Sequence, residues 1–274
     1  MKKFNLSDIA LIIFDLDGVI YRGNEPICSA VESIKRYYNL NKKIAFFTNN
    51  STLTRDSFCD KIRAMNISCS PEQVYTSSVI AADSLMKLYK ESSTAFVIGE
   101  TGLITSLCNN NIKVLNDLYT NEEIISNGSI ECEFVIVGLD TTLTYHKLAA
   151  ATQLISRGAD FYATNDDASL PSNFGLLPGA GAIVKFIEVT TGIKPISVFG
   201  KPSPEGIYQI LNNFKISPEN ALMIGDRPET DILCGKKANI QTALVLTGVT
   251  TKSDIMAIPE YIQPDIIIED LIKL

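Results

Sequence analysis

The chain has 274 residues, of which 46% are hydrophobic and 20% are charged. Such values are typical of a globular protein and argue against a disordered one. Acidic residues outnumber basic residues 31 to 24, and the net charge of -7 argues against a nucleic-acid partner, which would need a basic face.

The N-terminal region and the cysteines bear on location. The apolar run near the N-terminus is short and ends at Asp15, so it predicts neither a signal peptide nor a membrane span. The six cysteines are scattered and form no CxxC pair, which is typical of a reduced protein inside the cell. We therefore expect a cytoplasmic protein with no membrane partner.

Five short apolar runs near the two ends of the chain predict buried strands. Their hydrophobic residues are continuous rather than alternating, which is typical of strands covered on both faces in a parallel sheet. In chain order the runs are IALIIF (9–14), KIAFF (43–47), ISVF (196–199), ALMI (221–224) and TALVL (242–246). Segments of helical period lie between them, so the pattern predicts an α/β fold.

The middle of the chain repeats this alternation with strands of its own. They are AFVIG (95–99), FVIVG (134–138) and FYAT (161–164), with helical segments near 101–110 and 145–157. We therefore predict a smaller α/β domain, residues 80–179, inserted into a core formed by residues 1–79 and 180–274.

Polar residues follow four of the predicted core strands. Asp15 and Asp17 follow the first strand, and TNNST (48–52) follows the second. GKPSP, which contains Lys201, follows the third, and GDRPETD, which contains Asp226 and Asp231, follows the fourth. In a parallel sheet all four sets would lie along one edge, where ligands of α/β proteins bind.

Four carboxylates at one edge would repel one another unless a cation joined them. Mg²⁺ suits carboxylate and backbone oxygen, and a phosphate group can complete its coordination. Lys201 adds a positive charge, while Thr48 and Asn49 supply neutral donors for phosphate oxygens. Together these residues indicate a site for phosphoryl transfer.

The motifs DLDGV, TNNST, GKPSP and GDRPETD resemble, in order and spacing, the four motifs of the haloacid dehalogenase (HAD) superfamily. The resemblance is nearest to the NagD and para-nitrophenyl phosphatase branch, whose class IIA α/β cap is inserted between the second and third motifs. It extends through FVIVGLD, ATNDD, PGAGA and VLTGVT, so it covers essentially the whole chain. It implies a Rossmann-like, three-layer core with a parallel sheet and a smaller inserted cap.

The resemblance also implies roles for the aspartates. Asp15 would attack phosphorus and form a phospho-aspartate, and Asp17 would serve as general acid and then as general base. Mg²⁺ would be held by the Asp15 carboxylate, the Asp17 carbonyl and Asp226. Asp231 would be a further ligand or a partner of the ligands.

The phosphate and substrate residues follow by the same resemblance. Thr48 and Asn49 would bind the transferring phosphoryl group, and Lys201 would offset its charge. Members of this branch contact the leaving group from cap loops, and here the segment 163–175 is the expected loop, with Asn165, Asp166 and Leu170 as candidate contacts.

These roles predict a Mg²⁺-dependent phosphatase, a phosphoric monoester hydrolase that acts on a small phosphorylated metabolite, as a monomer or homodimer. Two alternatives stay open at this point. One is a phosphomutase or phosphotransferase, which would return an isomer or a transfer product rather than free phosphate. The other is a non-hydrolytic, phospho-accepting signalling module, which Asp17 and the large insert argue against.

Overall fold

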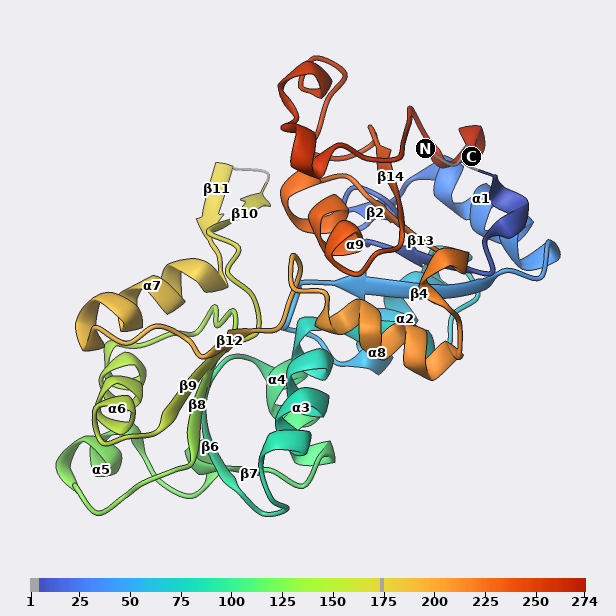
Figure 1. The fold of residues 1–274 in the computed structure, drawn as a ribbon. Helices are drawn as coiled ribbons and strands as arrows, with labels where there is room; N and C mark the ends of the chain where they lie inside the picture. Colours follow the sequence, from blue (N-terminus) through green and yellow to red (C-terminus); the bar gives the residue numbers. More distant parts are fainter. Residues whose placement is uncertain (1–4, 173–174) are drawn as a thin grey trace. The chain divides into compact units, whose positions relative to one another are not determined.

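The computed structural model describes residues 5–172 and 175–274. Contacts within the chain divide it into two compact units (Figure 1). The first unit contains residues up to Thr48, Arg55–Tyr75 and Lys201–Leu274, and the second contains Asn49–Thr54 and Thr76–Gly200. Among the described residues, no helix combines the length and the hydrophobicity that crossing a membrane requires.

The first unit is built on a six-stranded sheet with the order β15-β14-β13-β1-β4-β5. Its strands are β1 (Leu11–Phe14), β4 (Lys43–Thr48), β5 (Val74–Thr76), β13 (Ala221–Gly225), β14 (Gln241–Val245) and β15 (Ile266–Ile268). Neighbouring strands from β15 to β4 pair in parallel. Every residue of β1 and β13 is buried, as the continuous apolar runs predict.

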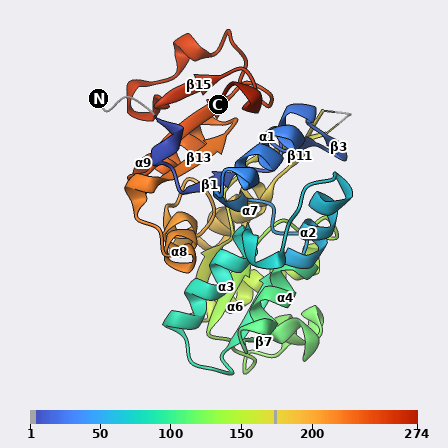
Figure 2. The ribbon, with the colours of Figure 1, turned by 90° about the vertical axis from the view of Figure 1, so that its right-hand side faces the viewer.

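Helices cover both faces of this sheet. They are α1 (Cys28–Asn39), α2 (Arg55–Ala64), α8 (Glu205–Phe214) and α9 (Leu233–Lys237). Figure 2 shows α1 and α2 on one side of the strands and α8 and α9 on the other. Buried side chains of α1 and α2 pack with Ile12 and Phe14 of β1, and a separate cluster around Ile232 and Leu244 lies on the opposite face. The predicted three-layer α/β core is therefore confirmed.

The strand register brings the predicted motifs to one edge of this sheet. Phe14, the last residue of β1, is level with Ile224 of β13 and Phe46 of β4. Because these strands run parallel, the chain that leaves each of them emerges at the same edge. A short hairpin, β2 (Tyr21–Arg22) and β3 (Glu25–Pro26), follows the end of β1.

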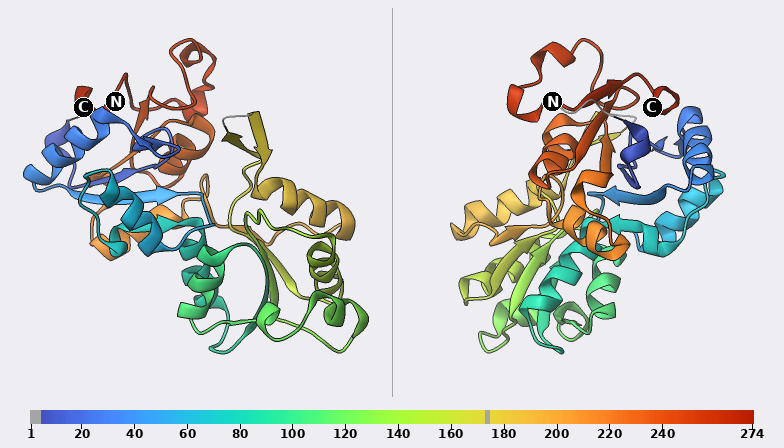
Figure 3. Two further views of the ribbon diagram at one scale, coloured as in Figure 1. Left: turned by 180° about the vertical axis from the view of Figure 1, so that it is seen from behind. Right: turned by 45° about the vertical axis from the view of Figure 1, so that its right-hand side comes forward.

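The second unit has a five-stranded parallel sheet with the order β12-β9-β8-β6-β7. Its strands are β6 (Thr94–Ile98), β7 (Lys113–Val114), β8 (Phe134–Val137), β9 (Asp160–Ala163) and β12 (Ser197–Val198). Its helices are α3 (Ser77–Leu88), α4 (Thr101–Asn109), α5 (Asn121–Ser126), α6 (Tyr145–Ser156) and α7 (Ala180–Thr191). In the two orientations of Figure 3, α5, α6 and α7 cover one face and α3 and α4 the other. A small antiparallel ribbon, β10 (Ser169–Ser172) and β11 (Gly175–Pro178), precedes α7.

The second unit is larger than the insert predicted over residues 80–179. It extends to Gly200 because α7 buries Ile183, Val184 and Ile187 in the core of the second sheet. The prediction that ISVF (196–199) is a strand of the core sheet was wrong. Its central residues form β12, which pairs with β9 of the second sheet through Ser197–Tyr162 and Val198–Ala163. The strand simply continues from α7 into the sheet on which that helix already packs.

Candidate active site

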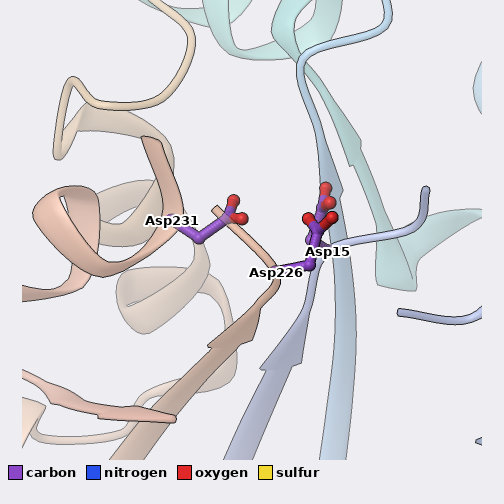
Figure 4. Close-up of side chains that lie close together, drawn as sticks. All are labelled: Asp15, Asp226 and Asp231. Atoms are coloured by element: carbon purple, nitrogen blue, oxygen red, sulfur yellow. The ribbon is translucent and has the colours of Figure 1, made fainter. Parts of the chain in front are cut away.

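Three buried aspartates converge at the carboxyl edge of the first sheet. Asp15 follows β1, Asp226 follows the neighbouring β13, and Asp231 lies in the π-helical turn Pro228–Ile232. One carboxylate oxygen of each lies within 4.8 Å of those of the other two, and the side chains point to one region (Figure 4). All three are less than a tenth exposed. The arrangement concentrates negative charge where little water can screen it.

Lys201 is the cation within this cluster. Its Nζ donates to Asp15 Oδ1 at 2.5 Å, to Asp231 Oδ1 at 2.7 Å and to the Phe47 carbonyl at 3.1 Å. Burial alone would lower the pKa of Lys201, but the two carboxylates outweigh it and raise the pKa. The lysine therefore stays charged and neutralises one unit of the local negative charge.

The negative charge that Lys201 does not neutralise helps to raise the pKa values of the carboxyl groups. Burial raises the pKa of Asp15 well above its usual range, Lys201 opposes that rise, and Asp231 and Asp226 add to it. Burial, followed by repulsion from Asp231, raises the pKa of Asp226 to about 6. With one buried lysine against three aspartates, the site needs further positive charge when all three are ionised.

The oxygen atoms of Asp226 and Asp231 indicate where such a cation fits. Asp226 Oδ2 accepts a hydrogen bond of 2.6 Å from the Val249 N–H, whereas Oδ1 is buried and has no hydrogen-bond partner among the described residues. Both oxygens of Asp231 accept hydrogen bonds, from Lys201 and from the Arg227 N–H at 3.1 Å. The donor set of Asp226 Oδ1 and Asp15 fits a divalent cation that prefers oxygen, with Asp231 holding the lysine.

Asp17 differs from the other aspartates because its side chain is exposed. Surrounding protein nevertheless raises the pKa of its carboxyl, and the positive charges of Lys61, Lys201 and Arg227 offset part of that rise. A hydrogen bond fixes the peptide that joins Asp17 to Gly18, because the Gly18 N–H donates to the Tyr21 carbonyl at 2.8 Å. An accessible carboxyl with a raised pKa suits proton exchange with a bound molecule.

The TNNST motif is divided between the two units. Thr48 ends β4 and is buried in the first unit, at the same sheet edge as Asp15. Asn49 belongs to the second unit, where its Nδ2 donates to Asp167 Oδ2 at 3.1 Å. Its carbonyl accepts hydrogen bonds from Ser77 Oγ at 2.6 Å and Asn165 Nδ2 at 2.9 Å. The second unit therefore holds the residue that directly follows Thr48.

The predicted substrate contacts of the insert all lie in the second unit. Asn165 is buried, and its Oδ1 also accepts a hydrogen bond of 3.2 Å from the Asp167 N–H. Asp166 is exposed, and Leu170 lies half-buried in β10. Asp166 and Leu170 are thus more accessible to a ligand than the Asn165 side chain.

The comparisons with known proteins agree with these motifs. A model of haloacid dehalogenase-like hydrolases matches residues 12–113, and a HAD-hydrolase-like model matches residues 198–274. The acid sugar phosphatase of Staphylococcus epidermidis is 35% identical over 245 residues, which are 89% of this chain and 89% of that protein. The chain belongs to the haloacid dehalogenase-like hydrolases.

Solved structures of this hydrolase family match the fold over almost the whole chain. A 4-nitrophenylphosphatase from Thermotoga maritima has a TM-score of 0.87 and 33% identity, over 97% of this chain and 96% of its own. A glycerol phosphate phosphatase from Mycobacterium tuberculosis, in complex with magnesium, has a TM-score of 0.86 and 27% identity, over 97% of this chain and 76% of its own. The chain is thus an enzyme of the phosphatase type, and the predicted NagD and para-nitrophenyl phosphatase branch is confirmed.

Some residues of this HAD hydrolase site were missed from the sequence. The Val249 N–H and the Phe47 carbonyl bind site residues through the backbone, which leaves no signature in the residue type. Lys61, on α2, affects the pKa of Asp17 although it is 44 positions away. The VLTGVT segment did carry a signal, because it follows a core strand and so must emerge at the same sheet edge.

Proposed function

We propose that the chain is a Mg²⁺-dependent phosphatase that hydrolyses small phosphate monoesters through a phospho-aspartate on Asp15. The observation that carries this proposal is the buried cluster in which Lys201 compensates only part of the charge of Asp15, Asp226 and Asp231. Phosphoryl transfer requires positive charge around the nucleophile, and the uncompensated carboxylates of this cluster would hold a divalent cation that adds it. Phosphatase relatives with high coverage support the same reaction class.

The proposed reaction has two steps. In the first, the Asp15 carboxylate bonds to phosphorus while the ester P–O bond breaks, and Asp17 donates a proton to the leaving oxygen. In the second, Asp17 takes a proton from water and the water oxygen bonds to phosphorus, while the bond between phosphorus and the Asp15 oxygen breaks, which releases phosphate and restores the Asp15 carboxylate. Bound Mg²⁺ would supply Lewis-acid neutralisation of the phosphoryl oxygens, held by Asp15, Asp226 and the Asp17 carbonyl.

Other residues would bind and orient the phosphoryl group. Thr48 and Asn49 would donate hydrogen bonds to its oxygens, and Lys201 would limit repulsion between those oxygens and Asp15. Asp231 would act by fixing the Lys201 ammonium, since its two oxygens are already committed to Lys201 and the Arg227 N–H. These assignments rest on the motif resemblance and on the hydrogen bonds described above.

We propose a small phosphorylated metabolite, of the sugar phosphate or polyol phosphate class, as substrate. The acid sugar phosphatase and glycerol phosphate phosphatase relatives support that class by their names. Asp166 and Leu170 are our candidates for contacts with the leaving group, and Asn165 is the weaker one because its side chain is committed within its own unit. The cytoplasmic location and the monomeric or dimeric state stay predictions.

The test is phosphate release from para-nitrophenyl phosphate and from a panel of sugar and polyol phosphates. We expect turnover in millimolar Mg²⁺, its loss in EDTA and its recovery when Mg²⁺ is restored. Turnover that persists in EDTA would contradict the metal requirement. An isomer of the substrate without free phosphate would indicate a phosphomutase, and a stable phosphoprotein without turnover would indicate a signalling module.

Magnesium should stabilise the protein in a pH-dependent way. Without metal, Asp226 has a pKa of about 6, above its value of about 3.9 in an unfolded chain. The folded state therefore binds more protons than the unfolded state between these values, and the stability of the metal-free protein falls as pH rises through this window. Mg²⁺ needs ionised carboxylates, so it should raise Tm by about 5–10 °C at pH 7.5 when in hundredfold excess over Kd, and much less at pH 5.

Differential scanning fluorimetry at pH 5, 6 and 7.5 measures this effect. Sodium chloride of equal ionic strength is the control, since it screens charge without entering the site. A magnesium shift in Tm of the same size at pH 5 and pH 7.5 would show that the ion does not bind through Asp226.

A further inference from the structure

The loop that follows β14 contacts both of the chain segments that would hold the cation. Thr247 Oγ1 donates to the Gly18 carbonyl at 2.7 Å, and the Val249 N–H donates to Asp226 Oδ2 at 2.6 Å. Gly18 directly follows Asp17, so this short loop contacts both the residue next to the Asp17 carbonyl and the second oxygen of the Asp226 carboxylate. We call residues 247–249 the strap.

The strap packs against Asp226 without spare room. A Cβ on Gly248 would lie 1.9 Å from Asp226 Oδ2, and a Cβ on Gly18 would lie 2.5 Å from the same oxygen. The Gly18 Cβ would also lie 2.9 Å from Gly248 Cα. Two glycines and a carboxylate thus meet at distances that no larger residue permits, which fixes the carboxylate against the strap.

Arg22 holds the strap from the other side. Its Nε and Nη2 donate to the Thr247 carbonyl at 2.8 and 2.6 Å. Arg22 is exposed and lies in β2, beside Tyr21, whose carbonyl accepts the Gly18 N–H. Because the guanidinium donates twice to one backbone carbonyl, it fixes the position of that carbonyl and does not neutralise a carboxylate. The contacts close a ring through Gly18, Tyr21, Arg22 and Thr247.

This ring constrains the oxygen atoms that would hold the cation. Since one oxygen of Asp226 is tied to the Val249 N–H, its other oxygen, Oδ1, is the one left for a ligand role. The Asp17–Gly18 peptide is held through its N–H by Tyr21, so in a trans peptide the Asp17 carbonyl points to the opposite side.

We propose that Arg22 and Thr247 are positioning residues for the magnesium site, acting through the strap on Asp226 and on the Asp17 carbonyl. The proposal rests on the proposed function, because it takes Mg²⁺ as the ion. The two residues would determine how tightly the protein binds Mg²⁺, and they would not determine which leaving group it accepts. Removal of a group that orients metal ligands typically lowers the affinity for the metal by about 10- to 100-fold.

The experiment measures the Mg²⁺ dissociation constant of the full chain by isothermal titration calorimetry, together with the Tm shift that Mg²⁺ produces. The variants are Arg22→Ala and Thr247→Val, with Thr247→Ser as the conservative partner that keeps the hydroxyl. Arg63→Ala is the matched control, because Arg63 is a half-exposed arginine of the same unit that donates to a backbone carbonyl, that of Cys69, at 2.8 Å.

We expect Arg22→Ala and Thr247→Val to weaken Mg²⁺ binding by about tenfold or more, and Thr247→Ser and Arg63→Ala to bind like the wild type. The half-saturating Mg²⁺ concentration for para-nitrophenyl phosphate should rise in parallel, with the ranking of substrates unchanged. Because Arg22 is exposed, its variant should fold even if Thr247→Val does not.

Two results would overturn the proposal. Wild-type Mg²⁺ affinity in folded Arg22→Ala would refute the positioning role proposed for Arg22 and the strap, while leaving the proposed function intact. A wild-type chain that hydrolyses phosphate esters without binding Mg²⁺ would refute the strap and the metal requirement together. A chain that binds Mg²⁺ tightly but hydrolyses no ester would refute the proposed function alone, and the affinity comparison among variants would still decide the strap.

Discussion

Replacement of Asp15 by asparagine is expected to reduce phosphatase turnover by about 10⁴-fold or more. Asparagine keeps the size of the side chain but replaces the carboxylate by an amide, which is a poor nucleophile toward phosphorus. The fold should survive, because Lys201 keeps Asp231 and the Phe47 carbonyl as acceptors. The substitution also removes the repulsion between the Asp15 and Asp226 carboxylates, which contributes to the raised pKa of Asp15.

The measurement is turnover of para-nitrophenyl phosphate in saturating Mg²⁺, with thermal unfolding to verify folding. Asp8→Asn is the matched control, since Asp8 is an exposed aspartate of the same unit and should keep full activity. Borohydride reduction during turnover should convert an acyl phosphate on residue 15 to the alcohol, which peptide mass spectrometry detects. Wild-type turnover in a folded Asp15→Asn variant would place the nucleophile elsewhere.

The convergence of the aspartates could be predicted because it follows from strand direction. Asp15 directly follows one buried apolar run, Asp226 follows another after Gly225, and the parallel register sets Phe14 level with Ile224. Neighbouring parallel strands then deliver both carboxylates to one edge. Continuous hydrophobicity is a strong signal for such strands, so this part of the fold and site was accessible from the sequence.

The allocation of segments to the two units could not be predicted in the same way. The run 196–199 is as apolar as the core strands, and nothing in its residues indicates which of two sheets it joins. The packing of α7 decides the matter, because that helix brings β12 to β9. Likewise Asn49 follows a first-unit strand, yet Ser77 and Asn165 bind its carbonyl within the second unit. Tertiary hydrogen bonds of this kind are invisible in local sequence.

Replacement of Lys201 by methionine is the second change for which we expect a large effect, on both activity and stability. Methionine fills a similar volume but leaves Asp15 and Asp231 without the ammonium that lies between them. Removal of one partner from a buried ion pair typically costs about 3–5 kcal/mol of unfolding free energy. Turnover should fall by about 10³-fold, since the repulsion between Asp15 and an incoming phosphate would lack this counter-charge.

The loss of stability should depend on pH, and the direction follows from the carboxyl groups. Burial and mutual repulsion already raise the pKa of Asp15 with Lys201 opposing, so removal of the lysine should raise it further. A folded-state pKa above the unfolded value means that the folded state binds the extra proton, so stability is lost as pH rises. In EDTA, Lys201→Met should therefore be far less stable than the wild type at pH 7.5 and closer to it at pH 5.

Lys42→Met separates charge compensation from packing. Lys42 is half-buried in the same unit, but its ammonium donates to backbone carbonyls, those of Leu6 at 2.9 Å and Ile9 at 2.5 Å. Its loss removes hydrogen bonds without exposing a buried carboxylate, so the destabilisation should be similar at pH 5 and pH 7.5 and activity should persist. Urea unfolding of both variants at the two pH values measures the difference. If Lys201→Met lost the same stability at pH 5 as at pH 7.5, its role would be packing, and the charge needed to hold Asp15 ionised would have to come from the cation alone.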